Sequence, residues 1–428
     1  MKHKKVHITT VGCPKNQVDS EVLAAQLKAN GYTLSETVDG ADVAVINTCG
    51  FIDAAKQESI ETILNIAGKK KSGNLKKVVV TGCLVERYKR ELQEGLGEVD
   101  AFFGTHEIKN ILGEFQAEYK YDMVGDRVLT TPSHYAYLKI SEGCDNPCSF
   151  CAIPLMRGKH SSKTIEEITH EAELLAAKGV KELIVVGQDT TYYGLDIYGR
   201  RTLPSLMEKL NKVDGIEWIR LMYAYPAKFP EELLDIMRDS DKVANYIDIP
   251  IQHVSDKLLR SMRRGITRRR LEELLQSIRE KVPGIAIRTT LIVGYPGEGE
   301  KEFQELLEFV SEFKFDRLGA FTYSVEEGTT AAILGDPVPQ DEKERRHAAI
   351  MEAQRQIIIE LNQKKIGTIQ RVIVDRKDGE DYVGRTCHDA PEIDSEVIIT
   401  SVNPIEIGSF VEVVIDDSYE HDMYGTVV

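Results

Sequence analysis

The sequence predicts an α/β protein with three modules: a parallel sheet covered by helices, a partial barrel of strand–helix repeats, and a small antiparallel β-barrel. Apolar, strand-like runs alternate with segments of helical spacing up to about residue 367, which favours parallel sheets. After that point short β-rich runs are separated by turn residues. The 428 residues are enough for two or three domains. We therefore divide the chain into residues 1–118, a linker 119–133, residues 134–367 and residues 368–428.

The first module places a cysteine directly after each of its three predicted strands. The strands are Val6–Val11, Val43–Ile46 and Val78–Val80, and the cysteines are Cys13, Cys49 and Cys83. Because the carboxyl ends of parallel strands meet at one edge of a sheet, where ligands bind, these thiols should converge. The adjacent glycines, Gly12, Gly50 and Gly82, suit tight turns or a close approach of backbone to an inorganic cluster. The alternative is three ordinary buried cysteines.

The second module contains six predicted strands with helical segments between them. Six repeats are too few for a closed eight-stranded barrel and predict a partial barrel, open on one side. The predicted strands are Tyr137–Ile140, Glu182–Val186, Trp218–Met222, Tyr246–Ile249, Ala286–Val293 and Arg317–Phe321.

A second cysteine group, Cys144, Cys148 and Cys151, follows the first strand of this barrel with C-x3-C-x2-C spacing. Three thiolates on one short loop can hold an iron–sulfur cube and leave one iron open for chemistry, since a [4Fe–4S] cluster normally takes four thiolates. Structural zinc also prefers four ligands, and the nearest downstream histidine, His160, would complete only an irregular site. Disulfides are disfavoured by the odd count of seven cysteines.

The third module is β-rich and acidic. Its predicted strands are Gln370–Val374, Tyr382–Arg385, Glu396–Ile399, Phe410–Ile415 and Gly425–Val428, a pattern typical of a small OB-like barrel. Residues 366–428 hold 4 Lys and Arg but 14 Asp and Glu, a net charge of −10 out of −15 for the whole chain. Such a surface should repel nucleic acid and attract basic partners, unless it is only a well-solvated face. Cys387 lies here without cysteine neighbours, and we expect it to be structural.

These six cysteines, their domain order and the β-rich tail resemble the methylthiotransferases of the radical S-adenosylmethionine (SAM) superfamily along essentially the whole chain. The resemblance implies a flavodoxin-like N-terminal domain, a radical SAM partial barrel and a TRAM domain. It implies two [4Fe–4S] clusters, an auxiliary one on Cys13, Cys49 and Cys83 and one on the C-x3-C-x2-C loop whose open iron binds SAM. One SAM would supply a methyl group and a second a radical, so no catalytic residue beyond the cluster ligands is expected.

The bound SAM must also contact loops at the strand ends. The candidates are Gly187 and Gln188 after the second barrel strand, Gly294 after the fifth, and Arg288 on the fifth strand as a partner for the SAM carboxylate. For each there is an alternative: glycines required by turns, and an arginine in a structural ion pair.

Two stretches, Gly12–Asn16 and Trp218–Pro226, resemble the branch of this family that modifies a ribosomal protein. That resemblance implies the β-carbon of an aspartate in small-subunit ribosomal protein S-twelve (uS12) as the target, free or in the assembled subunit. A strongly basic ribosomal protein would suit an acidic tail, whereas an RNA-gripping domain should be basic. A basic cluster instead favours contact with rRNA, although it could also be only a solvated helix surface. Its residues are Arg260, Arg263, Arg264, Arg268, Arg269 and Arg270.

Two other functions stay open from the sequence. One is the same methylthiotransferase chemistry on a tRNA adenosine, and the other is a non-catalytic, metal-containing RNA- or ribosome-binding protein. No window approaches the roughly 20 apolar residues that cross a bilayer, and the basic N-terminus is not followed by a signal-like apolar segment. We therefore expect a cytoplasmic protein without a membrane partner, supplied with electrons by a donor such as a flavodoxin.

Overall fold

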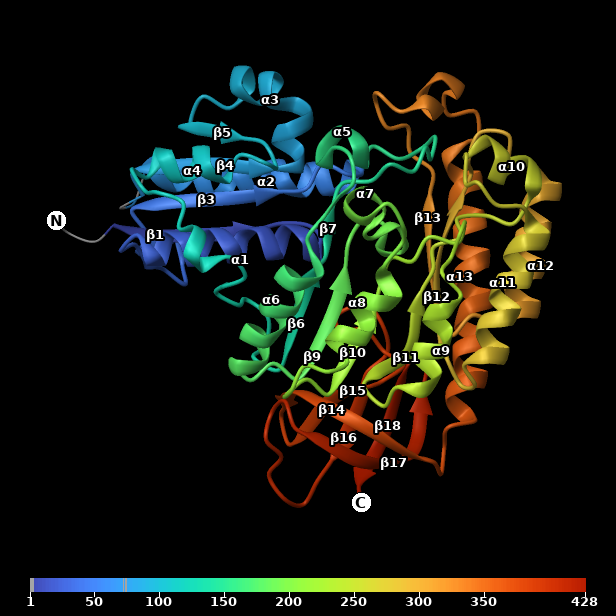
Figure 1. Ribbon diagram of the computed structural model, residues 1–428. Helices are drawn as coiled ribbons and strands as arrows, with labels where there is room; N and C mark the ends of the chain where they lie inside the picture. Colours follow the sequence, from blue (N-terminus) through green and yellow to red (C-terminus); the bar gives the residue numbers. More distant parts are fainter. Residues whose placement is uncertain (1–3, 72, 74) are drawn as a thin grey trace.

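A computed structural model describes residues 4–71, 73 and 75–428, so residues 1–3 of the basic N-terminal stretch lie outside it. In Figure 1 the N-terminal module is blue to cyan, the large central sheet runs from green to orange, and the C-terminal barrel is red below them. No helix among the described residues is long and apolar enough to cross a membrane.

The N-terminal module is a five-stranded parallel sheet in the order β2-β1-β3-β4-β5, which is the order of the flavodoxin fold. Its buried residues alternate between two faces, because successive side chains of a strand point to opposite sides. Val78 and Val80 pack under α2 and α3, while Val79 packs under α1 and α4. The elements are β1 (Lys5–Thr10), α1 (Pro14–Ala29), β2 (Thr33–Leu34), β3 (Val43–Thr48), α2 (Asp53–Gly68), β4 (Lys77–Gly82), α3 (Cys83–Gly95), β5 (Ala101–Phe103) and α4 (Ile108–Glu114).

The central module is an open six-stranded parallel sheet, confirming the predicted partial barrel. Its strands are β6 (Tyr135–Lys139), β9 (Glu182–Val186), β10 (Trp218–Leu221), β11 (Val243–Asp248), β12 (Ala286–Val293) and β13 (Arg317–Thr322). The longer helices are α6 (Ile165–Ala177), α8 (Leu203–Leu210), α9 (Glu232–Asp239), α11 (Arg268–Lys281), α12 (Glu300–Phe313) and α13 (Gln340–Gln363). Shorter elements are β7 (Ser141–Glu142), α5 (Ile153–Arg157), β8 (Ser161–Ser162), α7 (Leu195–Tyr198) and α10 (Asp256–Ser261).

The inner face of this sheet is closed by the two other modules. Outward residues of β6 and β9, such as Leu138 and Leu183, join the large core with the covering helices. Inward residues, among them Tyr137 and Ile184, form a separate apolar cluster. That cluster also contains Val18 from α1 and Ala390 from the C-terminal module. Apolar side chains from all three modules therefore line the interior of the partial barrel.

The predicted linker is anchored by a buried ion pair network. The Arg127 side chain is fully buried, and its guanidinium lies 3.3 Å from the Glu21 carboxylate of α1 and 3.2 Å from that of Glu171 on α6. It also donates a 2.8 Å hydrogen bond to the Tyr137 carbonyl. Removing one partner of such a network typically costs about 3–5 kcal/mol, so this segment fixes the first module against the second.

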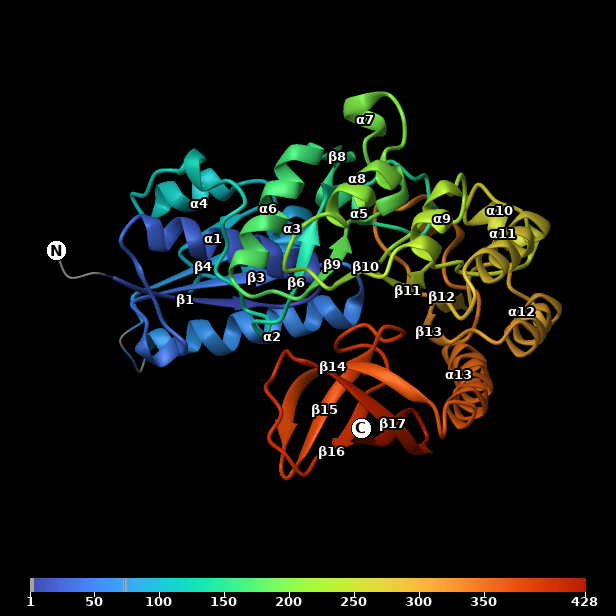
Figure 2. The same cartoon turned by 60° about the horizontal axis from the view of Figure 1, so that its bottom comes forward.

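The C-terminal module is a closed antiparallel-rich barrel in the order β14-β15-β16-β18-β17, as its β-rich pattern predicts. Figure 2 shows it beside α13 and below the amino ends of the central strands. The strands are β14 (Ile369–Asp378), β15 (Asp381–Thr386), β16 (Val397–Thr400), β17 (Phe410–Tyr419) and β18 (Asp422–Val427).

The loop 387–396 docks this barrel onto the central sheet with acidic side chains. Asp389 is fully buried and accepts a 3.0 Å hydrogen bond from Nε of Arg317 on β13. Asp394 accepts a 2.7 Å hydrogen bond from the hydroxyl of Tyr246 on β11. Part of the acidic excess of this module therefore points inward and balances buried arginines.

His388 should make this docking weaken in mild acid. Burial and the nearby Lys365 charge lower the pKa of His388 to about 4, whereas Arg317 holds the pKa of buried Asp389 at about 2. A histidine whose folded pKa lies below its unfolded value of about 6.5 gives its full stability above pH 6.5 and loses it as the pH falls toward 4. Between pH 6.5 and 5 we expect a loss of about 2 kcal/mol in urea unfolding. A His388→Gln variant should unfold with a flatter pH dependence, and equal slopes for both proteins would contradict this assignment.

Candidate functional site

The three N-terminal cysteines occupy neighbouring positions at the carboxyl edge of the flavodoxin-like sheet. Cys13 caps α1 after β1, Cys49 follows β3, and Cys83 is the first residue of α3 after β4. Cys49 and Cys83 are 8% and 6% exposed. Burial, opposed by the nearby Arg157 charge and reinforced by the neighbouring Cys13 and Cys49, raises the pKa of Cys83 to about 12. The thiols therefore lie close enough to interact, and a positively charged metal centre would stabilise them as thiolates.

Two glycines allow the loops that carry these cysteines to approach each other. Gly12 has φ of +102°, and a Cβ there would lie 2.6 Å from Cβ of Cys49 and 3.1 Å from its Sγ. Gly82 has φ of +104°, and a Cβ there would lie 2.5 Å from the Thr48 carbonyl. Any larger residue would push the cysteine loops apart. The set of three soft sulfur donors in this cradle fits an iron–sulfur cluster.

The second cysteine group lies on the loop between β7 and α5, at the carboxyl end of the central sheet. The Cys151 amide donates to the Cys148 carbonyl at 3.3 Å, and the Cys144 amide donates to the Gly158 carbonyl at 3.1 Å. Burial raises the pKa of Cys144 to about 11 and that of Cys151 to about 12. These contacts fold the loop into a three-sulfur donor set that fits a cluster with one open iron.

Arg264 and Tyr225 lie beside Cys148. The Arg264 guanidinium donates a 3.2 Å hydrogen bond to Sγ of Cys148, and its charged carbon lies 4.3 Å from the centre of the Tyr225 ring. The Tyr225 hydroxyl is 3.7 Å from the same sulfur. The Arg264 guanidinium therefore places a buried positive charge directly beside this sulfur.

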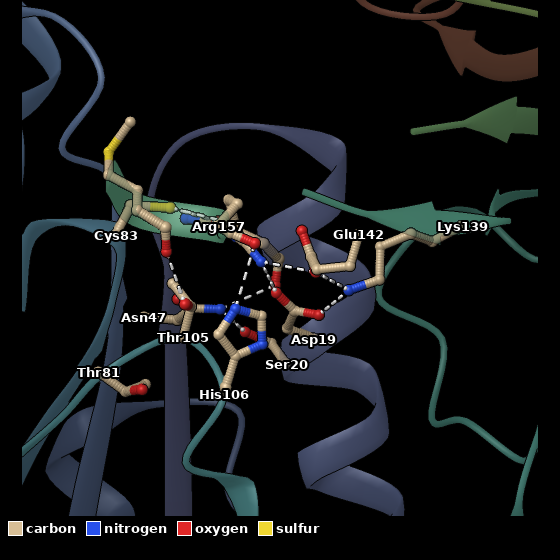
Figure 3. A network of polar contacts seen from close by, with 12 residues as sticks. Asp19, Ser20, Asn47, Thr81, Cys83, Thr105, His106, Lys139, Glu142 and Arg157 are labelled. Atoms are coloured by element: carbon tan, nitrogen blue, oxygen red, sulfur yellow. Dashed lines mark hydrogen bonds and ion pairs between the residues drawn. The ribbon is translucent and has the colours of Figure 1, made fainter. Parts of the chain in front are cut away.

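Arg157 connects the two cysteine groups. It ends α5, six residues after Cys151, and its Nε donates a 3.1 Å hydrogen bond to Sγ of Cys83. The residue after Cys151, Ala152, packs against Cys83 as well. Figure 3 shows the Arg157 guanidinium pointing into the first module beside Cys83 and Asp19. The N-terminal site and the central site are thus in direct contact.

Acidic groups hold this arginine in place. Arg157 bonds Asp19 of α1 at 2.6 Å and Glu142 of β7 at 3.0 Å, and it also donates to Asn16. Lys139 bonds Asp19 and lies 2.7 Å from Glu142 (Figure 3). Burial opposes ionisation of Glu142, but Lys139 and Arg157 outweigh it and lower its pKa to about 2. The network of opposite charges is therefore fixed across the junction of the two modules.

The four predicted SAM contacts lie in different surroundings. Gly187 and Gln188 follow β9 near the cysteine loop, where Gln188 donates to Glu142 at 2.6 Å and a Cβ at Gly187 would lie 2.7 Å from Oγ of Ser141. Gly294 packs closely against Lys343 of α13. Arg288 pairs with Asp248 at 3.4 Å and Asp394 at 3.3 Å, which is the structural alternative weighed for it. All four assignments remain predictions.

Sequence patterns did not identify Arg157 or Lys139 as site residues, and they placed Arg264 in a basic cluster for rRNA, whereas it is buried beside Cys148. Each becomes part of the site through a partner far away in the chain, and no spacing signal marks such a contact. Among the described residues no group of three or more His, Cys, Asp or Glu side chains is arranged to hold a single metal ion. Ligands of a cluster bind different irons and stand farther apart than ligands of one ion.

Three family patterns match consecutive parts of the chain. Residues 5–104 match "Uncharacterized protein family UPF0004", residues 138–310 the radical SAM superfamily, and residues 366–428 the TRAM domain. Curated proteins similar to this chain include "Ribosomal protein uS12 methylthiotransferase RimO" from Cytophaga hutchinsonii, 54% identical over 99% of this chain and 98% of the relative. The protein of the same name from Bacteroides fragilis is 49% identical over 100% of both chains.

Solved structures share the fold at low sequence identity. The radical SAM methyltransferase TsrM from Kitasatospora setae, with cobalamin and a [4Fe–4S] cluster bound, has a TM-score of 0.56 and 15% identity over 88% of this chain and 81% of that chain. The cobalamin-dependent radical SAM enzyme OxsB, with aqua-cobalamin and SAM bound, has a TM-score of 0.53 and 13% identity over 83% of this chain and 58% of that chain. At this identity the likeness concerns the fold alone.

Proposed function

Because the chain belongs to the RimO family of radical SAM methylthiotransferases, we propose that it adds a methylthio group to the β-carbon of an aspartate in ribosomal protein uS12. The chain is a radical SAM enzyme that uses SAM and iron–sulfur clusters, so the non-catalytic alternative is dropped. Its substrate, the use of two clusters and the assignment of the six cysteines are the parts we propose.

The contact of Cys83 with the segment that follows Cys151 is the observation that carries this proposal. Methylthio transfer needs a radical generated at one site and a sulfur delivered at another, and the substrate carbon must reach both sites. The packing of Ala152 with Cys83 and the hydrogen bond from Arg157 to the Cys83 sulfur support two such sites on adjoining segments. Positioning of this kind can account for about 7–11 kcal/mol of a reaction barrier.

The chain's own residues would hold the clusters, orient SAM and the substrate, and shield the radical from water. When bound, the clusters would supply the electron that cleaves SAM and a place for the sulfur to be methylated. Cys144, Cys148 and Cys151 would leave one iron open for SAM, while Arg264 would place a positive charge beside the Cys148 sulfur. The apolar inner face of the partial barrel, including Tyr137 and Ile184, would keep water away from a radical.

Exposed acidic residues of the C-terminal barrel support a basic protein as the partner. With Asp389 and Asp394 turned inward, eight carboxylates of this module remain exposed against three exposed cations. The exposed acidic residues are Asp378, Glu380, Glu392, Glu406, Glu412, Asp416, Asp417 and Glu420, and the exposed cations are Arg371, Arg376 and Lys377. Charge complementarity of this kind mainly accelerates association and is reduced by salt.

Neutralising four of these carboxylates should weaken uS12 binding. We expect the dissociation constant at low salt to rise roughly tenfold and its salt dependence to flatten, because rim charges act on the association rate. The four residues, which form no ion pair with described residues, would become Glu412→Gln, Asp416→Asn, Asp417→Asn and Glu420→Gln. Biolayer interferometry with immobilised uS12 at two salt concentrations measures the effect. These substitutions leave the buried carboxylates of the loop 387–396 in place, whereas deletion of the whole module would remove them.

A matched control neutralises four exposed carboxylates of the first module. It should bind uS12 as the unmodified enzyme does, so an equal loss in both variants would mean that only total charge matters. The control residues are Glu36, Glu58, Glu61 and Glu91.

RNA contact is the second candidate, favoured by the TRAM family match and by cations in a groove beside the cysteine loop, which also contains Glu231, Asp256 and Glu273. The groove has a volume of about 840 Å³, and Lys228, Arg260 and Arg263 line it without an ion pair among the described residues. Arg268 and Arg269 instead pair with Glu272 and Glu273. We propose that the groove contacts rRNA when the enzyme binds the whole ribosomal subunit. Tighter binding of free tRNA than of uS12 would instead favour tRNA as the substrate.

A further inference from the structure

Lys15 is a buried cation, and the carboxylate that acts on it, Asp248, does so without forming a direct ion pair. Its side chain is 7% exposed, and no hydrogen bond or ion pair to its ammonium group is found within the part of the chain that the structure describes. The nearest group is the face of the Tyr223 ring, whose centre lies 3.1 Å from Nζ. A cation–π contact offsets only part of the cost of burying an unpaired ammonium.

Lys15 lies where the two cysteine groups and the barrel interior meet. It follows Cys13 by two residues, in the first turn of α1. Its ring partner Tyr223 comes just after β10, at the carboxyl end of the sheet, and packs with the inner-face cluster. Two residues further on, the Tyr225 hydroxyl lies 3.7 Å from Sγ of Cys148. Lys15 is thus close in sequence to Cys13 and contacts, through Tyr223, the segment that carries Tyr225.

The acidic side chains in this region are already bound. Asp248 accepts the Tyr223 amide hydrogen at 3.1 Å and lies 3.4 Å from Arg288. Asp19 is bound by Arg157 and Lys139. Lys15 therefore has no direct ion pair, although Asp248 acts on it electrostatically, and an incoming anion could form one. A charge-assisted hydrogen bond in a buried place is among the strong ones.

We propose that Lys15 binds the side-chain carboxylate of the substrate aspartate and so selects an acidic residue for modification. This inference rests on the proposed function. The β-carbon is bonded directly to that carboxylate carbon, so a cation beside Cys13 would hold the reacting carbon near both cysteine groups. A site built around a charge rejects the uncharged analogue, because binding it leaves the buried ammonium unpaired.

A double-mutant cycle tests the pairing. The enzymes are the unmodified chain, Lys15→Met, which keeps the apolar stem, and Lys15→Arg, which keeps the charge. The substrates are uS12 and uS12 with asparagine at the target aspartate. We expect the unmodified enzyme to favour aspartate over asparagine by roughly a hundredfold in kcat/KM and in binding, and Lys15→Met to reduce this ratio to about threefold or less. Lys15→Arg should restore part of the ratio.

Lys28→Met on the exposed end of the same helix is the control and should keep the full ratio. Iron content and thermal unfolding would identify a variant that fails to fold. An unchanged aspartate-to-asparagine ratio in Lys15→Met overturns the inference, as does a higher KM for SAM with an unchanged KM for uS12. If the unmodified enzyme does not modify uS12 at all, the proposed function fails and this inference with it.

Discussion

Replacing Cys148 by alanine abolishes SAM cleavage and leaves the N-terminal cysteine site loaded. The remaining two thiolates of the loop cannot hold a cluster with one open iron, and Arg264 loses the sulfur to which it donates. We expect the iron content to fall from about eight to about four per chain and 5′-deoxyadenosine to fall to the detection limit. Iron analysis and chromatography after anaerobic reconstitution measure both quantities.

Cys387→Ala is the matched control for this variant. Cys387 lies in the docking loop, and its backbone carbonyl, not its thiol, accepts from Arg220. Both iron content and 5′-deoxyadenosine should stay at the level of the unmodified enzyme. Continued SAM cleavage by Cys148→Ala would remove this cysteine from the proposed ligands.

Replacing Cys49 by alanine should separate the two halves of the reaction. Cys49 lies against Gly12 in the N-terminal cradle and far along the chain from the C-x3-C-x2-C loop. The variant should lose about half of the iron, continue to form 5′-deoxyadenosine, and transfer no methylthio group. Mass spectrometry of uS12 beside 5′-deoxyadenosine analysis distinguishes the two halves. Methylthio transfer at an unchanged rate would mean that the first module has no part in sulfur delivery.

Strongly patterned elements of the fold could be predicted from the sequence alone. The predicted strands 182–186 and 286–293 agree with β9 and β12, because both are rich in apolar and β-branched residues. The position of Cys83 as the first residue of α3, directly after β4, was not predicted. α13 gave no apolar signal because much of its buried face is polar, with Lys343, Arg346 and Gln354 inside.

The sequence was sufficient to predict the cysteine sulfur donors of the candidate site, but not which side chains contact the residues around them. The carboxyl ends of parallel strands lie at one edge of a sheet, which is why Cys13, Cys49 and Cys83 could be placed together. Whether Arg288 faces a ligand or a carboxylate depends on Asp394, which lies 106 residues away in another module. Net charge likewise did not show that Asp389 and Asp394 of the acidic module point inward.

The most direct test of the account is a turnover assay with reconstituted enzyme, SAM and a reductant. Purified uS12, small ribosomal subunits and unmodified tRNA would be offered in parallel and analysed by mass spectrometry. The account predicts a methylthio gain on one aspartate of uS12, free or in the subunit, with 5′-deoxyadenosine formed alongside. A methylthio gain on tRNA, with uS12 unchanged in both forms, would contradict it.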